Sequence, residues 1–274
     1  MVKFGPIERL GTTWWFELFD LPKHNEAYVE GEIYRVLEDF ENKFSRFRDD
    51  SLVSKLNKDK AIKNPDPELV SILNLCKRLY EDTDKTFNIL VGDYLEMTGY
   101  DKDYNFDKKI ENLPGIPDLE SNLKVSDEEI TLGEEARIDL GGIGKGFLID
   151  KLAGIFKEEL GLSSFLINGG GDIFATEVDS EGFEVALKNP NEDGYLGKVT
   201  LINQGFAGSS PNLRRWKGSD GKTYSHLVGT CESTSEPKST FVVAPSATEA
   251  DVWATTLSIN PDAKIPEGIS AKII

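Results

Sequence analysis

The glycine-rich segment from Ile138 to Gly146 is the part of this chain best suited to bind an anion. It reads Ile-Asp-Leu-Gly-Gly-Ile-Gly-Lys-Gly, so four glycines stand beside Asp139 and Lys145. Glycines let backbone amides approach a ligand without a Cβ atom in the way, and the N–H groups that begin a helix carry partial positive charge. The pattern predicts a strand end at Ile138 and, after the turn, a helix that stops at Gly161. The turn either cradles a phosphate group or lets the helix pack closely on a sheet.

This turn matches neither of two standard nucleotide-binding motifs. A dinucleotide fingerprint has glycines at its first, third and sixth positions, but Phe147 is sixth when the count starts at Gly142. A P-loop requires Ser or Thr after Gly-Lys, and Gly146 occupies that position. The turn alone therefore does not identify a nucleotide.

The chain has two histidines, so few side chains can act as bases near neutral pH. His24 lies in a charged turn, which favours a solvated surface position. His226 lies in the strand-like stretch Tyr224–Val228, where alternation places its ring opposite Leu227. His226 is either a general base or a hydrogen-bonded structural histidine.

Asp251 and Thr255 are four residues apart on the last predicted helix and therefore share one face. Together they can offer a carboxylate and a hydroxyl to a hard cation, although Asp251 can equally serve as a cap or a solvated acid. Mg²⁺ prefers few protein carboxylates together with phosphate oxygens, so such a site suits the neighbourhood of a phosphate. Cys231 follows His226 by five residues, but no third group that would complete a nucleophilic site is evident.

Length and charge limit the classes of function. The 274 residues can bury a full core, and we expect one domain over 1–274 that could contain two close subdomains. A formal charge of −17 argues against nucleic acids and anionic membranes as partners. Two cysteines are too few for a disulfide framework, and the chain shows no secretory signal and no membrane span. We expect a cytoplasmic protein, or an extracytoplasmic one if a signal segment has been removed.

Periodicity predicts helices early in the chain and strands late. The expected strands are Thr12–Phe19, Ser164–Ile167, Phe183–Leu187, Lys198–Ile202 and Ser239–Ala244, and the expected helices are Glu26–Phe47, one that begins at Pro67 with Asp66 as N-cap, and Thr248–Leu257. This order indicates an α+β fold with largely antiparallel sheet rather than a doubly wound fold.

Taken in order, the motifs resemble those of the ApbE family of flavin transferases over nearly the whole chain. The matching segments are Leu10–Thr12, Phe44–Arg48, Asp50–Asn57, Lys85–Leu95, Asp139–Gly146, Ile167–Ile173, Gly221–Val228 and Ala250–Thr255. The most specific of them are the glycine turn and the second glycine-rich turn at Ile167–Ile173.

The resemblance implies an ApbE-like fold and a Mg²⁺-dependent reaction. FMN would pass from FAD to a Thr or Ser hydroxyl of an acceptor protein through a phosphoester bond, with release of AMP. The metal would be held by Asp251, Thr255 and the backbone carbonyl of Gly142, and His226 would take the proton of the hydroxyl. The residues at the family's FAD-contacting positions are Phe47, Thr86, Phe87, Asn88, Asp139, Lys145 and Leu227.

Three positions depart from the family pattern. Phe47 replaces a tyrosine, Asn88 replaces an acid, and Gly229–Ser233 replaces the usual Asp-Pro-x-Thr-Gly run after the histidine. Two alternatives use the same binding site. One is an FAD pyrophosphatase that gives FMN and AMP, and the other is a module that binds FAD without reaction.

Overall fold

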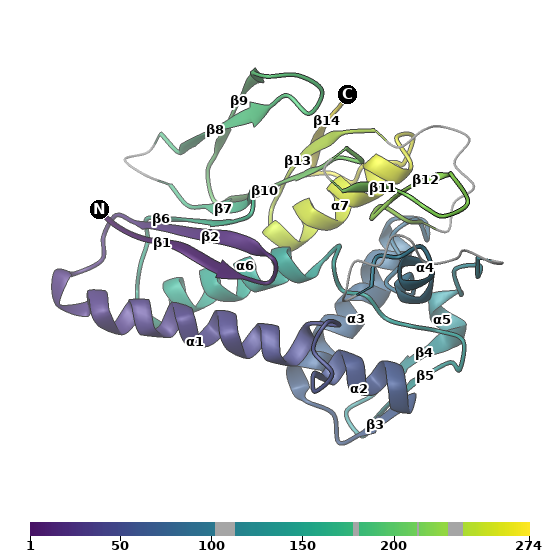
Figure 1. Cartoon of the computed structure of the whole chain (residues 1–274). Helices are drawn as coiled ribbons and strands as arrows, with labels where there is room; N and C mark the ends of the chain where they lie inside the picture. The colour runs from purple at the N-terminus through teal and green to yellow at the C-terminus, as the bar shows by residue number, and fades with distance from the viewer. Residues whose placement is uncertain (102–112, 178–180, 213, 230–237) are drawn as a thin grey trace.

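The computed structural model describes residues 1–101, 113–177, 181–212, 214–229 and 238–274. Its main element is a seven-stranded sheet in which every pair of neighbours is antiparallel (Figure 1). In spatial order the strands are β1 (Val2–Arg9), β2 (Thr12–Leu18), β6 (Phe165–Gly169), β7 (Asp172–Ala175), β10 (Gln204–Ser209), β13 (Thr240–Ala244) and β14 (Ser270–Ile273). The predicted α+β class with antiparallel sheet is confirmed.

Three helices lie along one face of this sheet. They are α1 (Glu26–Phe44), α6 (Gly144–Gly154) and α7 (Ala247–Ile259), seen below and in front of the strands in Figure 1. The opposite face packs against the hairpin β8 (Phe183–Lys188) and β9 (Tyr195–Leu201). Successive residues of β10 point to opposite sides: Phe206 packs with the hairpin and Ala207 with α7.

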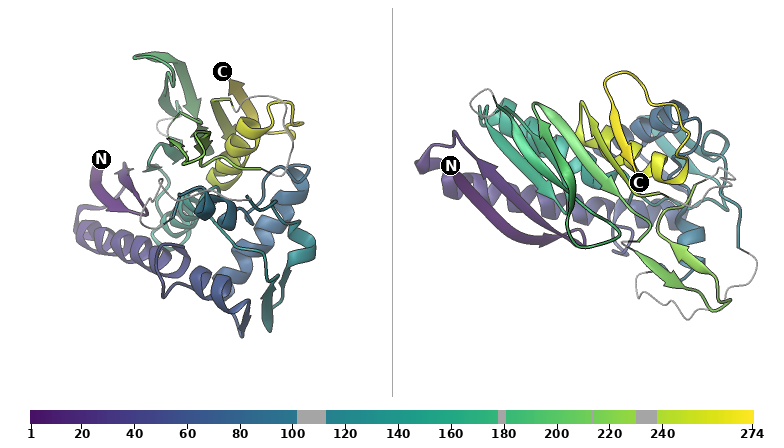
Figure 2. Two further views of the ribbon diagram at one scale, coloured as in Figure 1. Left: turned by 45° about the vertical axis from the view of Figure 1, so that its right-hand side comes forward. Right: turned by 90° about the horizontal axis from the view of Figure 1, so that it is seen from above.

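A second group of elements lies beyond the end of α1. It comprises α2 (Leu52–Asp59), α3 (Pro67–Asp82), α4 (Gly92–Met97), α5 (Leu119–Asn122) and a small sheet of β3 (Ala61–Lys63), β5 (Glu129–Leu132) and β4 (Leu123–Val125) (Figure 2). Asp66 caps α3 by accepting a hydrogen bond from the Glu68 amide, as predicted. One hydrophobic cluster joins the two groups, because it includes Trp14 on β2, Ile33 on α1 and Ile72 on α3.

No helix within the described ranges is both long and apolar enough to cross a bilayer. The predicted helix Glu26–Phe47 ends three residues early, at Phe44, where Ser45 is already extended. Helix α6 continues as a π-helical turn at Ile155–Glu159, and Gly161 follows with a φ of +65°, as expected for a glycine stop.

Gly146 permits the close contact between α6 and α7. A Cβ atom there would lie 2.6 Å from the carbonyl oxygen of Ala247 and 2.7 Å from the Cα of Thr248. Both atoms belong to the backbone and cannot rotate away. We therefore expect Gly146→Ala to lower the free energy of unfolding by roughly 3 kcal/mol, measured by urea denaturation.

Gly154 is the matched control for this substitution, because it ends the same helix and a Cβ atom there would meet nothing within 4 Å. Gly154→Ala should be neutral or stabilising by up to about 1 kcal/mol. Equal stabilities of the two variants would contradict the packing argument.

Candidate active site

The backbone that leads into the glycine turn is held by a side chain. The Asn57 amide donates to the Ile138 carbonyl at 2.9 Å, and its Oδ1 accepts from the Ile138 N–H at 2.7 Å. The Asp139 N–H donates to the Ile89 carbonyl at 2.8 Å. The prediction of a strand end at Ile138 is therefore wrong, because a buried amide on α2 supplies the hydrogen bonds that a neighbouring strand would supply.

Asp139 fixes the start of the turn and is buried. One carboxylate oxygen accepts from the Gly141 N–H at 2.6 Å, and the other pairs with Arg46. Arg46 also donates to the Tyr100 carbonyl at 2.7 Å, and its guanidinium carbon lies 4.2 Å from the ring centre of Phe47. No local sequence signal points to Arg46 as a partner of Asp139, because the two residues come together only in the folded chain.

Lys145 lies between two buried carboxylates. Its Nζ contacts Asp172 and lies 3.4 Å from Oδ2 of Asp251, which also accepts from the Gly146 N–H at 3.2 Å. Burial alone would lower the pKa of Lys145, but the charges of Asp172 and Asp251 outweigh it and raise the pKa. Lys145 is therefore an ammonium ion, and one amide of the predicted anion cradle is already bonded to Asp251.

Asp172 was not among the predicted site residues, although its glycine-rich turn was recognised. It begins β7, directly after the turn that follows β6. Burial raises the pKa of its carboxyl, with Lys145 opposing the shift and Asp251 adding to it. Asp172 and Asp251 both form ion pairs with Lys145, so Asp172 helps to set the position of the lysine.

Two of the three predicted metal-binding residues, Gly142 and Thr255, lie close together, and the third, Asp251, contacts the same turn at Gly146. A Cβ atom on Gly142 would lie 3.7 Å from the Thr255 hydroxyl oxygen and 3.3 Å from the Phe87 ring. Asp251 and Thr255 lie one turn apart on α7. Oδ1 of Asp251 and the hydroxyl of Thr255 form no hydrogen bond with any residue that the structure describes.

These free oxygens fit a hard divalent cation. Over the described ranges, no three His, Cys, Asp or Glu side chains gather to form a complete metal site. A carboxylate, a hydroxyl and a carbonyl leave several coordination positions open, which suits Mg²⁺ completed by phosphate oxygens and water.

The segment Thr86–Asn88 is buried and lies against this site. The side chain of Asn88 is used by the protein: it donates to the Pro117 carbonyl at 3.0 Å and accepts from the Leu90 N–H at 2.8 Å. A Cβ atom on Gly229 would lie 3.2 Å from the Thr86 carbonyl oxygen, so the chain after His226 reaches this segment. The contacts of these residues with FAD remain predictions.

Leu227 lines a cavity of about 430 Å³. Tyr94, Gly115, Ile116 and Val228 line the same cavity. The predicted FAD contact Phe47 is 39% exposed and its ring meets that of Tyr100 edge-on at 6.4 Å. Cys231 and most of the atypical loop after Gly229 lie outside the described residues.

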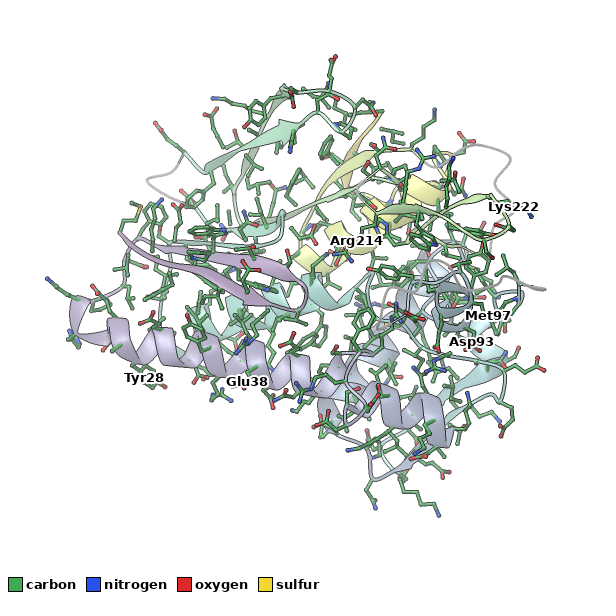
Figure 3. All side chains as sticks on the ribbon, in the orientation of Figure 1. Tyr28, Glu38, Asp93, Met97, Arg214 and Lys222 are labelled. Carbon is green, nitrogen blue, oxygen red and sulfur yellow. The ribbon has the colours of Figure 1, made fainter. Side chains whose placement is uncertain are left out.

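His226 stands one residue past β12 (Thr223–Ser225), the partner of β11 (Arg215–Lys217). Its Nδ1 is buried and has no hydrogen-bond partner in the described part of the chain. Burial, aided by the charges of Arg214 and Lys145, lowers the pKa of His226 to about 4, while the Arg214 main chain and Asp139 oppose the shift. The ring is therefore neutral at pH 7 and can accept a proton. Arg214, labelled in Figure 3, also binds the Tyr100 hydroxyl.

The lowered pKa of His226 makes a prediction about stability. Because the pKa of the folded state is near 4 and that of an unfolded histidine is about 6.5, the unfolded chain binds more protons between these values. The free energy of unfolding should therefore fall by up to about 3 kcal/mol through this residue as the pH drops from 6.5 to 4. Urea denaturation at several pH values should show that His226→Gln removes this part of the dependence. An identical pH dependence in the variant would contradict the assignment.

Comparison with known proteins identifies similar sequences. The ApbE family model matches residues 10–272. The FAD:protein FMN transferase of Escherichia coli K12 is 23% identical over 91% of this chain and 76% of its own length. The enzyme of the same name from Buchnera aphidicola is 25% identical over 91% of this chain and 77% of its own length.

Solved structures show the same fold. The flavinyl transferase ApbE of Pseudomonas stutzeri, in its apo form, superimposes with a TM-score of 0.77 at 18% identity, covering 99% of this chain and 94% of that one. The ApbE protein of Thermotoga maritima gives a TM-score of 0.74 at 23% identity, with 92% and 85% covered.

Proposed function

Because the chain belongs to the ApbE family, we propose that it is a Mg²⁺-dependent FAD:protein FMN transferase. It transfers FMN from FAD to a Thr or Ser hydroxyl of an acceptor protein and releases AMP. One observation carries the proposal. Thr255 lies beside Gly142 and Asp251 contacts Gly146 of the same turn, each with an oxygen that no described residue binds, and the charges of this turn also act on His226.

His226 is the general base of the proposed reaction. Its ring is neutral, and its Nδ1 has no hydrogen-bond partner among the residues that the structure describes, so this nitrogen can accept the proton of a hydroxyl. Burial of the ring strengthens this hydrogen bond, because the local dielectric constant is lower than that of water. The charges around the ring matter as well, because the nearby Arg214 and Lys145 oppose protonation of the ring before the hydroxyl arrives.

Lys145 and Asp251 prepare the site for the pyrophosphate of FAD. The ammonium group of Lys145 supplies positive charge beside the amides that begin α6. Asp251, Thr255 and the Gly142 carbonyl would hold Mg²⁺, which when bound neutralises phosphate charge in the transition state. Asp172 restrains Lys145, so the lysine stays beside the turn.

Product analysis tests this proposal against hydrolysis. The protein is incubated with FAD and Mg²⁺, with and without an acceptor protein that an ApbE-family transferase modifies, and AMP and free FMN are quantified. Transfer predicts AMP release that depends on the acceptor and leaves little free FMN. Equal amounts of free FMN and AMP without acceptor would identify a pyrophosphatase, and intact bound FAD would identify a binding module.

A further inference from the structure

Residues 214–222 form a basic segment next to the proposed active site. Arg214, Arg215, Lys217 and Lys222 are opposed by a single acid, Asp220, in a chain whose net charge is −17. Figure 3 shows Lys222 at the outer end of the β11–β12 hairpin and Arg214 at its inner end. Such a local reversal of charge favours an anionic partner at this hairpin.

The hairpin has one apolar face and one basic face. The register pairs Trp216 with Tyr224, and both are buried; their rings are stacked with centroids 6.5 Å apart. Strand alternation sends Arg215 and Lys217 to the other face, where both are exposed and form no ion pair with a described residue. Among the described residues, Arg215 donates to the Asn212 side chain alone, at 3.0 Å.

A polar cavity of about 580 Å³ lies beside the hairpin. Arg215 and Lys238 contribute its two cationic side chains, and Thr223, Ser225 and Ser239 contribute hydroxyl groups. No acidic side chain lines it among the described residues. The cations and hydroxyl groups that line this cavity can bind carboxylate groups.

The backbone of β12 can accept a further strand. The Gly218 N–H donates to the Lys222 carbonyl at 2.9 Å, so these two residues form a hydrogen-bonded pair. In an antiparallel pair of strands, such pairs alternate with pairs whose backbone groups point outward. The N–H and C=O groups of Thr223 and Ser225 therefore point away from β11. Within the described ranges, β11 is the one strand that pairs with β12. His226 is the residue that directly follows this edge strand.

We propose that the acceptor protein docks as an extended acidic segment on the edge of β12; this inference rests on the proposed function. Side chains of an added strand alternate between its two faces. When the reactive hydroxyl faces inward to His226, the residues one and three positions away face outward to Arg215, Lys217 and Lys238. Acids at those positions would complement the basic face.

In the transfer step the acceptor oxygen forms a bond to the FMN phosphorus. The bond between that phosphorus and the bridging oxygen of the AMP portion breaks, and AMP leaves with the electron pair. The proton of the hydroxyl goes to His226.

Synthetic peptides test the docking arrangement. Each has 11 residues with one central Thr and no Ser; one set carries Asp at positions ±1 and ±3, a second carries Asp at ±2 and ±4, and a third is neutral. Each is incubated with protein, FAD and Mg²⁺, and the gain of one FMN is followed by mass spectrometry together with AMP release. We expect kcat/KM for the first set to exceed that for the second by roughly tenfold, because only its acids face the hairpin cations.

Charge variants complete the test. The double variant R215Q/K217Q should lose roughly tenfold in kcat/KM for the first peptide set and keep its KM for FAD. The control K63Q/K124Q removes the same charge from exposed positions of the small β3–β5–β4 sheet and should have no effect.

The outcomes separate the two proposals. Equal modification of the three peptide sets, or equal loss in the two double variants, would overturn the acidic docking segment while leaving FMN transfer in place. Modification of an acceptor protein but of none of the peptides would overturn docking at β12. AMP release matched by free FMN, with no acceptor modified, would identify a pyrophosphatase and overturn the proposed function. Absence of AMP release under all conditions would overturn the proposed function itself.

Discussion

Asp251→Asn should abolish FMN transfer, with a fall of at least about 10³-fold in kcat. Loss of the carboxylate that we propose as a metal ligand would remove several kcal/mol of charge stabilisation from the transition state. The substitution keeps the size of the side chain and its place against the Gly146 amide. Metal binding gives a second readout. Titration with Mn²⁺, followed by electron paramagnetic resonance, should show weak or no binding in the variant.

Asp262→Asn is the control for this experiment, because Asp262 is an exposed carboxylate just beyond the end of α7. It should retain full transfer and full Mn²⁺ binding. Normal Mn²⁺ affinity in Asp251→Asn would remove this residue from the metal site, whatever its activity.

His226→Gln should lower kcat for transfer by about 10²- to 10⁴-fold, the usual contribution of a positioned general base. The affinity for FAD, measured by the quenching of flavin fluorescence, should change little. We expect the transfer rate of the wild type to depend on pH through a group with a pKa of about 4. The residual rate of the variant should lack this pH dependence.

The other histidine provides the control. His24 lies in the short 3₁₀ turn Lys23–Asn25, away from β12. His24→Gln should leave both transfer and FAD binding unchanged. A loss of FAD affinity in His226→Gln as large as its loss of rate would make His226 a structural residue.

Elements with strong periodicity were predictable from the sequence. The strand at Thr12, the helix capped by Asp66 and the final helix all occur where expected, because each has a clear apolar face or a specific cap. The strand β10 was missed. Its sequence Gln-Gly-Phe-Ala-Gly-Ser has little β propensity, but the close approach of Ser246 requires a glycine at position 205.

The motifs that form the site were predictable from the sequence, but the contacts between its side chains were not. Gly142, Asp251 and Thr255 all belong to motifs that are visible in the sequence, and the fold brings Thr255 close to Gly142 and Asp251 to Gly146 of the same turn; their role as metal ligands stays a prediction. The partners Arg46 and Asp172 were missed, because their contacts with Asp139 and Lys145 form between distant parts of the chain. The same holds for Asn57, which replaces the strand that Ile138 was expected to join.

The most direct test of FMN transfer is the intact mass of an acceptor protein after incubation with this protein, FAD and Mg²⁺, with AMP quantified in the same sample. The proposed function predicts a gain of one FMN per acceptor, matched by an equal amount of AMP, and loss of both in Asp251→Asn. An unchanged acceptor mass, obtained with an acceptor that an ApbE-family transferase modifies under the same conditions, would contradict the proposal.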